Sequence, residues 1–154
     1  MQERFVSTVR DIREVATADA PPSDRLQHAM ELIHQDHPHY EWVGVYILRD
    51  VALELGAFVG APTEHTRIPI GRGVCGTAAA TRANQIIEDV RKLDNYLACS
   101  ATVRSEIVVL VWDREEIIGG IDADCDETGA FTAADEKFLT VVAAILAPLV
   151  RAVQ

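Results

Sequence analysis

The sequence has few basic residues, few cysteines and no long apolar run. Fourteen Lys and Arg against 24 Asp and Glu give the 154 residues a formal net charge of −10. Because this charge repels a phosphate backbone, we expect no nucleic-acid partner. The longest apolar stretch, residues 141–150, is short and contains Pro148, so we expect no membrane partner or membrane span.

The three cysteines are too few, and odd in number, for the disulfide framework of a secreted domain. They form no Cys-x-x-Cys pair, and the three histidines around Pro38 are expected in a surface loop, so no metal site is predicted. The first five residues alternate charged and apolar types, unlike a signal peptide. We therefore expect a cytoplasmic protein whose thiols stay reduced unless a reaction oxidises them.

Length and a 49% apolar composition predict one domain, residues 1–154. Its expected parts are N-terminal helices in residues 1–35, a sheet with site loops in 42–131, and a C-terminal helix in 132–154. Apolar residues at three- and four-residue spacing predict the helices. Ser23 is the expected cap of the second helix, and Thr132 with Asp135 forms the capping box of the last.

Branched and aromatic runs predict strands, and their order predicts the fold class. Strands are expected at residues 42–48, 53–59, 106–112 and 116–122, with shorter extended segments at 67–70 and 85–88 and a short helix at 77–81. Helices outside and strands inside predict an α+β fold with a central antiparallel sheet. The long helices would pack on one face of the sheet, and a ligand pocket would lie under loops on the other face.

Two cysteines and three acidic residues lie in segments where an ordinary apolar core does not explain them. Cys75 lies in a glycine-punctuated turn and Cys99 in a polar loop, while Asp122 and Asp124 fall in a strand-like stretch. Alternation along a strand puts Asp122 and Asp124 on the same face. If Glu106 joins them, mutual repulsion and burial would raise the proton affinity of at least one carboxylate, leaving an acid that can donate a hydrogen bond.

The strand at residues 42–48 predicts one wall of the pocket. Trp42, Gly44 and Tyr46 share a face by alternation, and the small residue between two aromatic side chains is expected to leave a hollow. Trp42 and Tyr46 would shape this hollow around a substrate.

The segments that carry these residues resemble the single-domain GAF proteins that reduce free methionine-(R)-sulfoxide. The resemblance runs from about residue 42 to residue 131, and its specific part is the glycine-rich thiol motif with Ser-Glu-Ile-Val downstream. The matching segments are Trp42-Val-Gly-Val-Tyr46, Arg67-Ile-Pro-Ile-Gly-Arg-Gly-Val-Cys-Gly-Thr77, Ala98-Cys99, Ser105-Glu-Ile-Val108 and Ile121-Asp-Ala-Asp124.

The resemblance implies a role for each of these residues. The thiol matching Cys99 attacks the sulfoxide, the thiol matching Cys75 can resolve the product, and carboxylates matching Glu106, Asp122 and Asp124 hold the sulfoxide oxygen. It implies free methionine sulfoxide as the substrate, thioredoxin or a similar thiol donor as the reductant, and no cofactor.

One departure from the family and several other interpretations stay open. Many members carry a further cysteine at the position of Thr66. The chain could instead be a GAF sensor that binds a small ligand, or a redox sensor, and its terminal helices could pair with a second copy to make a homodimer. The aromatic residues could be ordinary strand residues, the acids a solvated strand end or a turn cap, and the cysteines small core residues, which is what we expect of Cys125.

Overall fold

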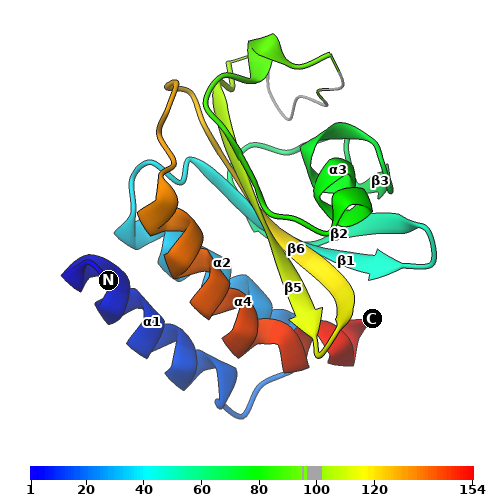
Figure 1. The fold of residues 1–154 in the computed structure, drawn as a ribbon. Coiled ribbons are helices and arrows are strands. Elements are labelled where there is room, and N and C mark those ends of the chain that lie inside the picture. The colour runs from blue at the N-terminus through cyan, green and yellow to red at the C-terminus, as the bar shows by residue number, and fades with distance from the viewer. Residues whose placement is uncertain (95, 97–101) are drawn as a thin grey trace.

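The computed structural model describes residues 1–94, 96 and 102–154 and shows a six-stranded antiparallel sheet with helices on both faces (Figure 1). Three long helices cover one face and a short helix lies against the other. The elements are α1 (Glu3–Ala16), α2 (Pro22–Asp36), β1 (Trp42–Arg49), β2 (Ala52–Val59), β3 (Arg67–Pro69), α3 (Gly73–Thr81), β4 (Gln85–Ile87), the 3-10 turn η1 (Val90–Lys92), β5 (Ser105–Asp113), β6 (Glu116–Cys125) and α4 (Ala133–Val153).

The strand order β3-β2-β1-β6-β5-β4 places β1 beside β6 in the centre of the sheet. Two hairpins, β1–β2 and β5–β6, are therefore joined through their first and last strands. In this register Trp42 pairs with Asp124, and Gly44 pairs with Asp122. The predicted antiparallel α+β fold is confirmed.

The main core lies between the sheet and helices α1, α2 and α4. Val43, Val45 and Ile47 of β1 point into it, as does Ile121 of β6, and all four are at most 1% exposed. Alternation along β1 therefore sends the aromatic residues to the opposite face, as predicted. No helix in the described part of the chain is both long and apolar enough to cross a bilayer.

The helix starts show one prediction confirmed and one wrong. The Thr132 hydroxyl oxygen accepts a hydrogen bond from the Ala134 N–H, and the Thr132 N–H donates to the Asp135 carboxylate, which is the predicted capping box. Ser23 does not cap α2, because the helix already begins at Pro22. Proline has no N–H to satisfy and a fixed φ, so it suits the first helical position.

The hollow predicted at Gly44 is filled by protein. A Cβ at this position would lie 2.6 Å from the Trp42 ring and 3.0 Å from Phe58 Cβ. The Trp42 ring lies over the glycine and stacks on Phe58, with ring centroids 5.7 Å apart. The glycine therefore makes room for an aromatic side chain rather than for a ligand.

The histidines near Pro38 are not surface residues as a group, and this prediction was wrong for His37. His34 and His37 have the spacing of a metal-binding pair, but His37 is fully buried and its Nε2 lies 2.9 Å from Thr8 Oγ1. The Nδ1 of His34 lies 2.8 Å from the Tyr40 carbonyl oxygen. Both rings thus make structural contacts that hold α1 and α2 together with β1.

Candidate active site

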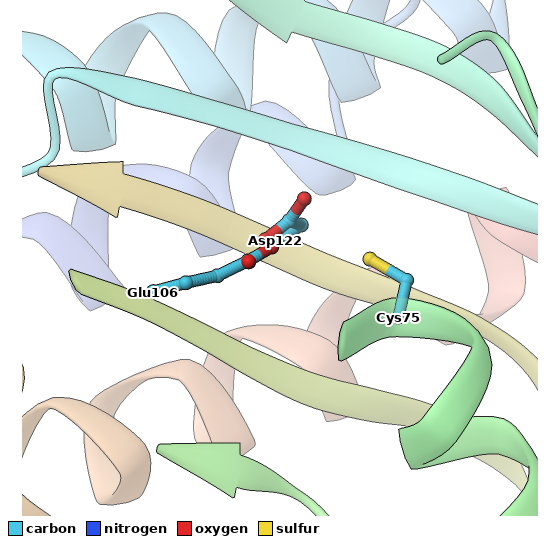
Figure 2. A group of neighbouring side chains, drawn as sticks. All are labelled: Cys75, Glu106 and Asp122. Atoms are coloured by element: carbon cyan, nitrogen blue, oxygen red, sulfur yellow. The ribbon is translucent and has the colours of Figure 1, made fainter. Parts of the chain in front are cut away.

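Side chains from three separate elements meet on the sheet face opposite the long helices. Cys75 comes from the first turn of α3, Glu106 from β5 and Asp122 from β6. One sulfur or oxygen atom from each lies within 4.8 Å of the others. Figure 2 shows the Cys75 sulfur pointing toward the carboxyl groups on the two strands. The three side chains are at most 5% exposed.

The pairing of β5 with β6 brings the acids together. Glu106 is registered with Asp124, and Val108 with Asp122. Ile121 and Ala123, which flank Asp122, belong to the core under the long helices, so Asp122 and Asp124 both face the other way. Glu106, 16 positions before Asp122 in the sequence, comes close to it through the pairing of β5 with β6. The predicted convergence of acids is therefore observed.

The turn before α3 positions the thiol. Gly71 and Gly73 have φ angles of 93° and 61°, values that favour glycine. A Cβ on Gly76 would lie 2.6 Å from the Pro69 carbonyl oxygen, and the Gly71 N–H donates to the Gly76 carbonyl over 2.8 Å. The glycines let the turn fold tightly onto β3, which places Cys75 over the sheet.

Burial and mutual contact change the acidity of this cluster. Burial, followed by the negative charges of Asp122 and Glu106, raises the pKa of the Cys75 thiol well above its usual value. Burial also raises the pKa of Asp122, although hydrogen bonds with Glu106 and Cys75 oppose the shift. A hydrogen bond between two carboxyl groups requires that one of them carries a proton, so the pair holds a proton that a free carboxylate would lose.

A small cavity of about 150 Å³ lies beside the cluster. It is bounded by Asp124 from β6 and by Trp42 from β1, whose indole N–H donates to the Ala61 carbonyl oxygen over 3.0 Å. The remaining lining residues are Glu41, Ala61, Thr102, Val103 and Asp126. Trp42 therefore lines a cavity together with its cross-strand neighbour, the buried carboxylate Asp124.

Tyr46 lies deeper than a residue that shapes a substrate pocket would. Its side chain is fully buried, and its hydroxyl donates to the His65 carbonyl oxygen over 2.9 Å. Through this hydrogen bond Tyr46 holds the loop after β2 against strand β1.

The remaining cysteines differ in what the structure says of them. Cys99, the predicted nucleophile, lies outside the described residues. Cys125 faces the main core, and its thiol donates to Glu41 Oε1 over 3.4 Å. Burial, the main cause, raises its pKa to about 11. These contacts fit the structural role expected for Cys125.

Sequence reasoning missed Glu41. It accepts hydrogen bonds from the Cys125 thiol and from the Asp126 backbone N–H, and it lines the cavity. It directly precedes β1, where an acid looks like an ordinary strand flank, so the sequence carried no signal for it.

Comparison with known proteins identifies the family. A family model described as the GAF domain matches residues 21–148. A protein of Escherichia coli (strain K12) named free methionine-R-sulfoxide reductase is 37% identical over 94% of this chain and 87% of its own length. The chain is a GAF protein of the free methionine-R-sulfoxide reductase family.

Solved structures in this family share the fold. The type II free methionine-R-sulfoxide reductase from Thermoplasma acidophilum is 38% identical, with a TM-score of 0.83 over 92% of this chain and 96% of that one. The free methionine-R-sulfoxide reductase from Neisseria meningitidis, solved in complex with its substrate, is 29% identical, with a TM-score of 0.90 over 99% and 92%. The resemblance inferred from the sequence is thus confirmed.

Proposed function

We propose that this protein reduces free methionine-(R)-sulfoxide to methionine with a cysteine as the nucleophile. The buried cluster of Cys75, Glu106 and Asp122 is the observation that carries the proposal, because it holds a thiol beside an acid with a raised pKa. Sulfoxide reduction needs an acid that protonates the oxygen, and its completion needs a second thiol that resolves the oxidised nucleophile. Support also comes from a member of the family with this fold that was solved with its substrate bound.

In the first step the Cys99 sulfur attacks the sulfur of the sulfoxide. The oxygen passes from the substrate to Cys99, which becomes a sulfenic acid, while the substrate sulfur gains two electrons and leaves as a thioether. Negative charge builds on the oxygen during the attack. The proton held between Glu106 and Asp122 can be donated to that oxygen, which bare carboxylates would repel.

In the second step the Cys75 thiol attacks the sulfenic acid. A disulfide forms between Cys75 and Cys99, and the oxygen leaves as water with the thiol proton. Asp122 accepts a hydrogen bond from Cys75 and so lies where it can take the thiol proton and pass it to the leaving oxygen. The raised pKa of Cys75 keeps it a thiol until that moment, which suits a resolving cysteine.

Two further residues complete the proposed site. Asp124 and its cross-strand neighbour Trp42, which both line the cavity, would hold the substrate. Tyr46 would act by positioning the loop after β2. The disulfide would be reduced by thioredoxin or a similar dithiol through exchange, since it must open after each turnover. Thioredoxin dependence, a homodimer and a cytoplasmic location stay predictions of the sequence.

The test is a coupled assay with thioredoxin, its reductase and NADPH. The wild type should consume NADPH with the R epimer and not with the S epimer. Cys99→Ser should abolish the consumption, whereas Cys125→Ser should keep it, because Cys125 faces the other side of the sheet. A wild type that is silent with both epimers, even with dithiothreitol, would end the proposal, and tight binding of the R epimer without turnover would favour the sensor.

A further inference from the structure

We propose that Cys75, Glu106 and Asp122 form a binding site for a thiophilic divalent cation, with Zn²⁺ as the best match. The proposal concerns binding alone and does not depend on the reductase activity. No local sequence motif predicts this metal site, because the three residues come from a helix and two strands and meet only in the folded chain.

The donor set fits zinc. Thiolate sulfur and carboxylate oxygen are both zinc ligands, and three protein ligands leave the fourth tetrahedral position to water. The thiolate distinguishes this set from the all-oxygen sites that suit Mg²⁺ and Ca²⁺. The donor atoms already lie within 4.8 Å of one another. A tetrahedral zinc site needs about 3.5 Å between donor atoms. Side-chain rotations that move the donor atoms by about 1 Å would bring them to this spacing.

The charge of the cluster also points to a cation. One thiol and two carboxyl groups are buried in contact, and Asp124 lies next to them on β6. Buried groups of one sign are tolerated only when protons neutralise them or a cation pairs with them. Burial raises the pKa of both Cys75 and Asp122, which favours their protonated forms when no ion is bound. A divalent ion would replace those protons, and its charge would favour the thiolate and both carboxylates at once.

One oxygen of the buried Asp122 carboxylate is available to coordinate a cation. The residue is 2% exposed, yet its Oδ1 atom has no hydrogen-bond partner among the described residues. Figure 2 shows the Asp122 side chain between Glu106 and Cys75. A buried acceptor without a partner costs free energy, and coordination to a metal ion would recover it.

The test is a titration of the reduced, metal-free protein with Co²⁺, whose thiolate complexes have a charge-transfer absorption band in the near ultraviolet. Cys99→Ser with Cys125→Ser leaves Cys75 as the only thiol, and this protein should still show the band. Adding Cys75→Ser should remove it. In the same background Glu106→Gln and Asp122→Asn should each weaken binding about tenfold or more. Glu115→Gln, at an exposed carboxylate on the β5–β6 turn, is the matched control and should bind as tightly as its parent.

A second measurement needs no variant. In the wild type, Zn²⁺ should protect Cys75 from alkylation, read by mass spectrometry of the peptides, and should release at least one proton per ion bound near neutral pH. The proposal is wrong if the protein with Cys75 alone shows no band, if the band survives Cys75→Ser, or if Cys75 is alkylated equally fast with and without zinc. All of these readouts work without substrate, so they stand apart from any failure of the reductase assay.

Discussion

The two faces of the sheet bury different kinds of side chain. Toward α1, α2 and α4 the strands present branched apolar side chains such as Val45 and Ile121, both fully buried. Toward α3 the same two central strands present Trp42, Tyr46 and two buried aspartates. The first face lowers the free energy of the fold by removing apolar surface from water, whereas the second gives up part of that gain to hold charged groups together. A single sheet thus separates stability from chemistry by alternation alone.

The largest expected effect is on the helix-covered face. Phe138→Ala in α4 removes a fully buried ring that stacks on Phe5, with centroids 4.4 Å apart. We expect the free energy of unfolding to fall by about 3–5 kcal/mol, measured by urea denaturation. Val51→Ala, at a 67% exposed position, is the control and should change it by less than about 0.5 kcal/mol. Equal losses in the two variants would contradict the assigned core.

The same face should respond to acid through His37. Burial is the main cause that lowers its pKa to about 4, with Arg4 and His39 acting in the same direction and Asp36 and Asp135 opposing it. Below pH 6.5 the unfolded chain binds a proton that the folded chain excludes. Burying His37 therefore has no proton-linked cost above pH 6.5. The free energy of unfolding falls by about 2–3 kcal/mol as the pH drops toward 4.

Denaturation of a His37→Gln variant tests this pH dependence. The loss between pH 7 and pH 4.5 should become smaller than in the wild type, because the group that titrates is gone. His28→Gln, at an exposed position of α2, should leave it unchanged. An unaltered slope in His37→Gln would assign the acid sensitivity to other groups.

On the face that carries the site, Gly76→Ala should damage the thiol turn. The new Cβ would lie 2.6 Å from the Pro69 carbonyl oxygen and 3.0 Å from the Gly71 nitrogen, so α3 must move away from β3. We expect a loss of about 1–2 kcal/mol, in spite of the better helix propensity of alanine. Thr81→Ala at the exposed end of α3 should have little effect, and a stabilised Gly76→Ala variant would refute the close approach.

The smallest expected effect has the opposite sign. Asp122→Asn should raise the free energy of unfolding at pH 7 by about 1 kcal/mol, while activity is lost. The pKa of Asp122 is raised by burial, so the folded state keeps a proton that the unfolded state releases above about pH 4. The cost of Asp122 therefore grows as the pH rises through this window, and the gain from Asn should grow with it. A gain that shrinks toward high pH would show that Asp122 is not a destabilising group.

Sequence reasoning succeeded where periodicity decides the structure. The apolar spacing in α1 and α4 and the alternation in β1 gave the helices and the two faces correctly. The acids were also predicted, because Asp122 and Asp124 violate the pattern of a buried strand, and Glu106 lies in the strand that pairs with theirs. These features are encoded locally or by a single hairpin.

The remaining details depend on packing that no local pattern carries. The void expected at Gly44 is closed by the Trp42 side chain, a choice of rotamer that alternation does not specify. The Glu41 contact with Cys125 joins residues that are distant in the sequence. The closeness of Cys75 to Asp122 likewise follows from how α3 sits on the sheet, which the glycine motif suggests but does not determine.

The adjacency of β1 and β6 has a consequence for biosynthesis. Trp42 meets its partner Asp124 about 80 positions later, so the contact order at the centre of the sheet is high. A nascent chain that has completed β1 and β2 still exposes one edge of β1 until β6 leaves the ribosome. That edge is open to pairing with other chains during translation, and the acid cluster can form only after β6 has been made.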